Sequence, residues 1–279
     1  MDLRKLKTIF IFILIAINII LATVLYNARN YKSEEKKSMT ENLTYLLAEN
    51  MIYIPKTTEI PDSPDIHSFY LEKMFGSGNE MPVKFLGEEY TEESGIYKNE
   101  AGTLWVSGDE FTFQREKGQD KVFDFSAENI EDLCREEMKR LGMMSEVYAF
   151  SGINYIDEGI RAIFTVQQER MEFFDAYISF DVSENGIFGI SGKNIISDIK
   201  VSGGTTPYYS VISILADLVK SEGLEKNVGH TIVSIKPGYY IGKSEESYRN
   251  ILAIPVWQIA TDRGVILHYD ARSGQKIEE

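Results

Sequence analysis

The sequence has little of the residue chemistry on which disulfides and metal sites depend. Among 279 residues there is one cysteine, Cys134, and there are three histidines, His67, His230 and His268. One cysteine cannot form an internal disulfide, and histidines this far apart match none of the usual zinc-binding spacings. We therefore expect no metal ligands and no cofactor, and we expect Cys134 to be a small core residue of a helix.

Basic residues are also scarce. Lys and Arg number 29 against 43 Asp and Glu, which gives a formal net charge of −14. A body this acidic repels phosphate backbones, so nucleic acid is excluded as a partner. The Walker loop and the G-x-S-x-G elbow are missing as well. We predict that the protein is not an enzyme, that it has no catalytic residues and that it has no small-molecule substrate.

What the chain does have is one long apolar run. Residues 8–26 read TIFIFILIAINIILATVLY, without charge, proline or glycine. As a helix this run would reach roughly 28 Å, close to the hydrocarbon thickness of a bilayer. A basic tail at 1–7 precedes it and a charged linker at 27–37 follows it. The pattern predicts a single-pass protein of the cell membrane, with a cytoplasmic N-terminus and an extracytoplasmic body.

A cleaved signal peptide is the alternative interpretation of the same run. The run is longer than the usual apolar core of a signal peptide, and no clear small-x-small cleavage site follows it. We therefore favour an uncleaved anchor.

Asn18 is the strongly polar residue inside the run. An amide in hydrocarbon seeks a hydrogen-bond partner. Steps of four and three residues place Ile11, Ile15, Asn18 and Ala22 on one stripe of a helix, and Ala22 is small enough for another helix to approach closely. We predict that this stripe binds a partner helix. The alternative is that a long apolar run tolerates one amide and that the helix is a tether.

The rest of the chain combines short strands with three expected helices. Caps, apolar spacing and terminal glycines place these helices at 38–51, 126–141 and 206–223. We predict an N-terminal extracytoplasmic α+β domain at 38–123 and a C-terminal extracytoplasmic α+β domain at 124–279.

The C-terminal part contains what look like two copies of one unit. Helix starts at Ser126 and Thr206, and turn glycines at Gly186 and Gly264, recur at nearly the same spacing. One amphipathic helix cannot bury its apolar face alone, and covering a sheet is the natural solution. The fold class that we expect is α+β, with one transmembrane helix followed by antiparallel sheets that are each covered by a helix.

The clearest strand is FFDAYISFDV at 173–182. Strict alternation predicts that Phe174, Ile178 and Phe180 point into the core, whereas Asp181 lies on the wet face.

Both ends of the chain resemble the YycI (WalI) family. The N-terminal matches are Lys7, Thr8, Ile9, Phe10, Ile11 and Asn18, with Leu3 where the family usually has Trp. The C-terminal matches are Gly238, Tyr239, Tyr240, Pro255, Trp257, Tyr269, Asp270, Ala271 and Gly274. This ending is also similar to the PepSY-like hairpin that YycI shares with its partner YycH. The middle of the chain is matched only in pattern.

The resemblance implies a PepSY/YycH-like fold and a non-enzymatic regulator from Gram-positive bacteria. With a YycH-like partner, such a protein binds a WalK (YycG) sensor histidine kinase of a two-component system, through its transmembrane helix and external domains. It thereby adjusts kinase activity and cell-wall metabolism. The alternative is a tethered PepSY-like module that binds a wall fragment or inhibits a protease.

Overall fold

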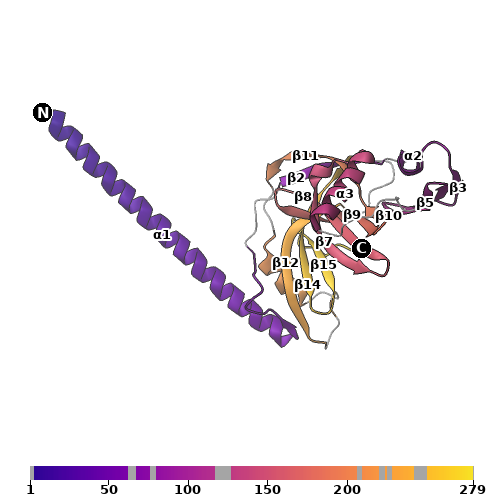
Figure 1. Cartoon of the computed structure of the whole chain (residues 1–279). Helices are drawn as coiled ribbons and strands as arrows, with labels where there is room; N and C mark the ends of the chain where they lie inside the picture. The colour runs from indigo at the N-terminus through magenta and orange to yellow at the C-terminus, as the bar shows by residue number, and fades with distance from the viewer. Residues whose placement is uncertain are drawn as a thin grey trace.

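The computed structural model describes residues 3–61, 67–75, 80–116, 127–205, 209–219, 224, 228–241 and 250–278. Within the described residues, more of the chain lies in strands than in helices. Figure 1 shows a body of sheets and short helices, from which one long helix extends.

One large mixed sheet forms the centre of the body. Within the described residues it contains twelve strands, in the order β15-β14-β12-β9-β10-β6-β5-β4-β3, with β1 paired to β12 and the β7–β8 hairpin paired to β9. The strands are β1 (Ile52–Tyr53), β3 (Thr91–Glu93), β4 (Ile96–Asn99), β5 (Gly102–Ser107), β6 (Glu110–Arg115), β7 (Tyr148–Ile156), β8 (Gly159–Gln168), β9 (Met171–Ser183), β10 (Gly186–Lys193), β12 (His230–Tyr240), β14 (Ile254–Thr261) and β15 (Ile266–Asp270).

The expected fold class is therefore wrong. Two parallel pairings, β1 with β12 and β12 with β9, join a segment of the expected N-terminal domain and both of the expected C-terminal units in one sheet. The physical reason is the length of β9, which pairs with two different strands along one of its edges. Its start pairs with β12 and the rest of it pairs with β10. The result is one mixed sheet instead of a series of antiparallel sheets, each with its own helix.

A second, smaller sheet has the order β11-β2-β13. Its strands are β2 (His67–Lys73), β11 (Ile196–Thr205) and β13 (Asn250–Leu252). It packs on the large sheet through aromatic side chains. The Phe69 ring lies 5.1 Å from the Tyr239 ring and 6.4 Å from the Phe173 ring. Strands far apart in sequence thus share one core.

Four α-helices are described, and two of them cover the large sheet at different places. They are α1 (Leu3–Glu49), α2 (Glu80–Leu86), α3 (Ala127–Arg140) and α4 (Val211–Leu218), and a 3₁₀ turn, η1, spans Ser145–Val147. The buried face of α3 contains Ile130, Cys134 and Met138, and this confirms Cys134 as a core residue. The helix α4 packs on β12, β14 and β15. Its expected start at Thr206 lies outside the described residues.

The predicted transmembrane span at 8–26 is not supported. Residues 3–49 form one continuous helix, so the apolar run continues without a break into the charged segment 27–37. Over the part of the chain that the structure describes, no helix combines the length and apolar character needed to cross a bilayer. The single-pass membrane localisation, with its cytoplasmic N-terminus and external body, is corrected accordingly.

Strand β9 departs from the alternation expected of it. Ile178 and Phe180 are fully buried, as predicted, but Phe174 is only partly buried and its neighbour Phe173 is buried instead. The reason is a bulge. In the pairing of β8 with β9, Thr165 lies opposite Tyr177 and Gln167 lies opposite Glu172. The segment of β9 between Glu172 and Tyr177 is therefore longer than the segment of β8 that it faces. A bulge moves the following side chains to the other face.

The bulge predicts that Phe173 contributes more to stability than Phe174, which is the opposite of the order expected from regular alternation. Phe173→Ala should reduce the free energy of unfolding by about 3–5 kcal/mol, because it opens a cavity in the core. Phe174→Ala should cost clearly less, because its ring is already partly exposed. Urea unfolding of both variants measures the difference. A larger loss of unfolding free energy in Phe174→Ala than in Phe173→Ala would show that β9 alternates regularly and has no bulge.

Candidate functional site

The most exposed apolar surface of the described chain lies on α1. The residues that carry it are 14–26, which we call the apolar stretch. Its large hydrophobic side chains are between 47% and 65% exposed. They are Leu14, Ile15, Ile17, Ile19, Ile20, Leu21, Val24, Leu25 and Tyr26. Contiguous exposed apolar patches of this kind are unusual on monomeric proteins, so this surface is the candidate interaction site.

The predicted stripe lies within this stretch. Ile15, Asn18 and Ala22 are all exposed, whereas the Ile11 side chain lies outside the described part of the chain. The Asn18 amide donates a hydrogen bond from Nδ2 to the Leu14 carbonyl oxygen, at 2.9 Å. Asn18 therefore does not need a partner helix to satisfy this donor, and the argument for the stripe rests on its exposure more than on the amide.

The C-terminal end of α1 is firmly attached to the body. Leu43 and Leu47 are buried in a cluster with α4. Just after the helix, Met51 has a positive φ of 61°, and its carbonyl oxygen accepts the His230 backbone N–H at 2.9 Å. Strand β1 then pairs with the start of β12. The end of α1 is therefore connected to β12 through β1.

His230 lies at this junction, as the first residue of β12. Its side chain is 3% exposed, and neither ring nitrogen has a hydrogen-bond partner among the described residues. A buried polar ring without partners costs stability. The other two histidines differ, since His67 contacts Glu169 at 3.2 Å and His268 Nε2 lies 3.1 Å from Gln258.

Several of the C-terminal residues that resemble YycI lie near the segment before α4. The Trp257 indole donates to the Tyr209 carbonyl oxygen at 3.1 Å, and the Ala271 N–H donates to the Pro255 carbonyl oxygen at 2.9 Å. A Cβ on Gly274 would come within 2.8 Å of the Tyr209 ring. These contacts connect β14, β15 and the segment before α4.

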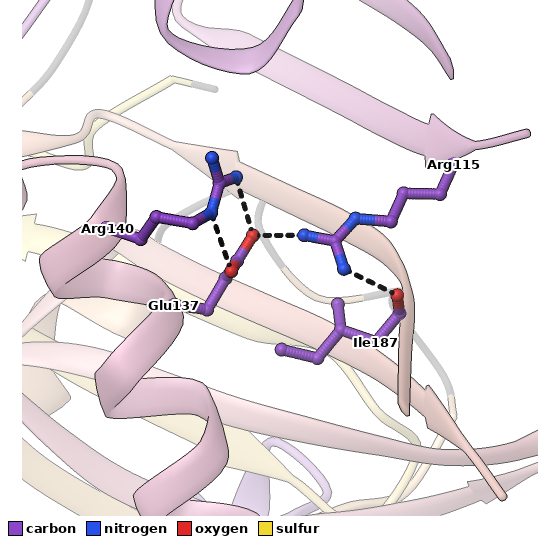
Figure 2. Close-up of polar contacts among 4 residues, drawn as sticks. All are labelled: Arg115, Glu137, Arg140 and Ile187. Carbon is purple, nitrogen blue, oxygen red and sulfur yellow. Dashed lines mark hydrogen bonds and ion pairs between the residues drawn. The ribbon is translucent and has the colours of Figure 1, made fainter. Parts of the chain in front are cut away.

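A buried charge network holds α3 in place. Glu137, on α3, is 5% exposed. Its Oε1 accepts hydrogen bonds from Arg115 of β6 at 2.5 Å and from Arg140 at 2.8 Å (Figure 2). Arg115 also donates to the Ile187 carbonyl oxygen at 3.2 Å. Burial lowers the pKa of Arg115, and the hydrogen bond to Glu137 raises the pKa of Arg140. The network connects the helix to two strands.

Loss of Glu137 should therefore destabilise the protein. Glu137→Ala leaves Arg115 buried without its carboxylate, which should cost about 3–5 kcal/mol of unfolding free energy. Glu136→Ala, at the neighbouring exposed position, is the control and should be close to neutral. Equal effects of the two changes, measured by urea unfolding, would contradict a structural role of the network.

A hollow of about 580 Å³ lies beside the amino end of α3. Its lining includes Ile130 of α3 and residues from two hairpins, β7–β8 and β9–β10. We call it the turn hollow. Sequence patterns do not reveal it, because it depends on how three segments distant in sequence come together.

Comparison with known proteins adds little to this picture. No protein-family model matches the chain, and no curated protein matches it. A solved structure of an uncharacterized protein from Eubacterium rectale is 13% identical, with a TM-score of 0.48, over 86% of this chain and 99% of its own. The Bacillus megaterium YpeB C-terminal domain, which is PepSY-related, is 10% identical, with a TM-score of 0.34, over 72% of this chain and 93% of its own. It is a weak structural neighbour.

Proposed function

We propose that this protein is a non-enzymatic regulatory subunit of the YycI type. In this proposal it binds a WalK/YycG-like sensor histidine kinase, together with a YycH-like partner, and adjusts kinase activity and thereby cell-wall metabolism. Residues near both ends of the chain support the family assignment by their resemblance to YycI. The observation that carries the binding function is the exposed apolar stretch of α1.

The apolar stretch is suited to contact a helix of another protein. Complete burial of a large aliphatic side chain contributes roughly 1.5–3 kcal/mol, so a few such residues on one face supply substantial binding energy. Anchor residues three and four positions apart are the usual means by which a helix contacts its partner. In this stretch, Ile15, Asn18 and Ala22 have that spacing, and all three are exposed.

The attachment of α1 offers a route from binding to regulation. A partner that holds the apolar stretch acts on a helix whose far end contacts α4 and leads into β1. Because β1 pairs with β12, and β12 with β9, the helix is connected to the centre of the large sheet. In this proposal, partner binding at α1 and the conformation of the body therefore influence each other through α1.

The test replaces residues 8–26 by an unrelated apolar helix of equal length. We expect the replacement to abolish co-purification with the kinase and to change kinase output, because the replacement removes the stripe. Asn18→Leu alone should weaken co-purification roughly two- to tenfold, the range expected for the loss of one interfacial hydrogen bond.

Thr23→Val is the matched control for Asn18→Leu. The Thr23 hydroxyl also bonds to its own helix, through the Ile19 carbonyl oxygen at 2.8 Å, but Thr23 lies off the stripe. Unchanged partner binding and unchanged output in the replacement would contradict the proposal, and would leave α1 as a tether.

A further inference from the structure

Two hairpin turns meet at one end of the large sheet. Ile156 pairs with Gly159, so the β7–β8 turn consists of Asp157 and Glu158. Ser183 pairs with Gly186, so the β9–β10 turn consists of Glu184 and Asn185. Because β8 and β9 are antiparallel neighbours, the start of β8 lies next to the end of β9. The topology thus places Glu158 and Glu184 at the same end.

Gly159 allows this close approach of the two strands. It has a φ of +155°, and a Cβ at this position would lie 2.1 Å from the Val182 carbonyl oxygen. Any other residue would push the two turns apart. The backbone itself therefore determines how close the two turns lie at the turn hollow.

The lining of the turn hollow is apolar at its base and acidic at its rim. Ile130 and Ile160 are buried, and Ile153 is partly buried. The remaining lining residues are Tyr155, Glu158, Gly159, Ser183, Glu184 and Asn185. A volume of about 580 Å³ is in the range of pockets that hold small organic molecules.

The charge of the rim favours a cation. Both glutamates are exposed, and within the described ranges neither has an ion-pair partner. The amino end of α3 opposes them with about half a positive charge, which two full carboxylate charges outweigh. The ring of Tyr155 is 90% exposed, so its face is open to a cation. The net charge of −14 adds a long-range attraction of the same sign.

We propose that the turn hollow binds an organic cation with an apolar body. The chemical class is a primary ammonium or guanidinium group on a hydrocarbon or aromatic stem. The stem lies on Ile130, Ile153 and Ile160, and the cationic group lies between the two glutamates. The same chemistry occurs in free amines and in Lys or Arg side chains of a peptide. This site is independent of the apolar stretch of α1.

The experiment is a ligand-observed NMR titration of the full chain with probes that differ in charge. The free-amine probe is 2-phenylethylammonium, and its neutral and anionic counterparts are 2-phenylethanol and phenylacetate. The peptide probe is acetyl-Leu-Arg-Phe-amide. We expect both cationic probes to bind, the neutral probe to bind more weakly and the anionic probe not to bind. The stronger of the two cationic probes identifies the source of the ligand.

Variants of the rim test where the probe binds. Replacing Glu158 and Glu184 together by Gln should weaken binding of the cation about fivefold, and Tyr155→Ala should weaken it about twofold or more. Glu169→Gln is the matched control, because Glu169 is an exposed glutamate in the β8–β9 turn and does not line the hollow. All four positions are exposed, and thermal unfolding checks that each variant folds.

Three results would overturn the proposal. They are equal binding of all probes regardless of charge, no binding of either cationic probe, and an equal loss of affinity in the rim variants and in Glu169→Gln. None of these results bears on co-purification with a kinase, so failure of this proposal is distinguishable from failure of the proposed function.

Discussion

The carboxylate of Asp175 makes the contact on which the arrangement of the large sheet depends. Asp175 lies in the bulge of β9 and is 6% exposed. Its oxygens accept hydrogen bonds from the Ile241 backbone N–H at 2.8 Å and from the Asn194 side chain at 3.3 Å. Hydrogen bonds to a charged group contribute about 1.5–3 kcal/mol each, and a buried carboxylate without them would be costly. The hydrogen bonds from Ile241 and Asn194 therefore stabilise the bulge.

The bulge determines what each end of β9 contacts. The end after the bulge pairs with β8 and β10, and its buried side chains share a core cluster with α3, which the network around Glu137 holds in place. The end before the bulge pairs with β12, which leads to β1 and to the attached end of α1. One strand therefore connects the turn hollow at one end of the sheet with the helix that carries the proposed partner contact. Under the proposed function, this connection is a physical path between the two surfaces.

Local features of the fold could be predicted from the sequence, and long-range features could not. The helix expected at 126–141 is observed at Ala127–Arg140, because its apolar spacing and the glycine after it are local signals. Gly186 and Gly264 have positive φ, as expected of turn glycines. The face of β9 was mistaken at Phe174, since a bulge depends on partners such as Ile241 that no local pattern contains. The same limit explains the wrong fold class, because the pairing of Glu172 with Gly238 joins distant segments.

In the candidate sites, too, the local features could be predicted from the sequence and the long-range ones could not. The exposed stripe on α1 follows directly from helical spacing, although the hydrogen bond from Asn18 to Leu14 had no place in that prediction. The two turns of the hollow are readable from Gly159 and from Asn185-Gly186. Their proximity to each other, and to Ile130, depends on the pairing of β8 with β9 and on the packing of α3.

We propose that one face of the apolar stretch contacts a kinase or a YycH-like partner. The most direct measurement is photo-crosslinking in the native cell, with a benzoylphenylalanine placed at one position at a time from 14 to 26. We expect crosslinks to these partners at Ile15, Asn18 and Ala22, and few on the opposite face, at Ile17, Ile20 and Val24. Crosslinks of equal strength around the whole helix, or none to either partner, would contradict it.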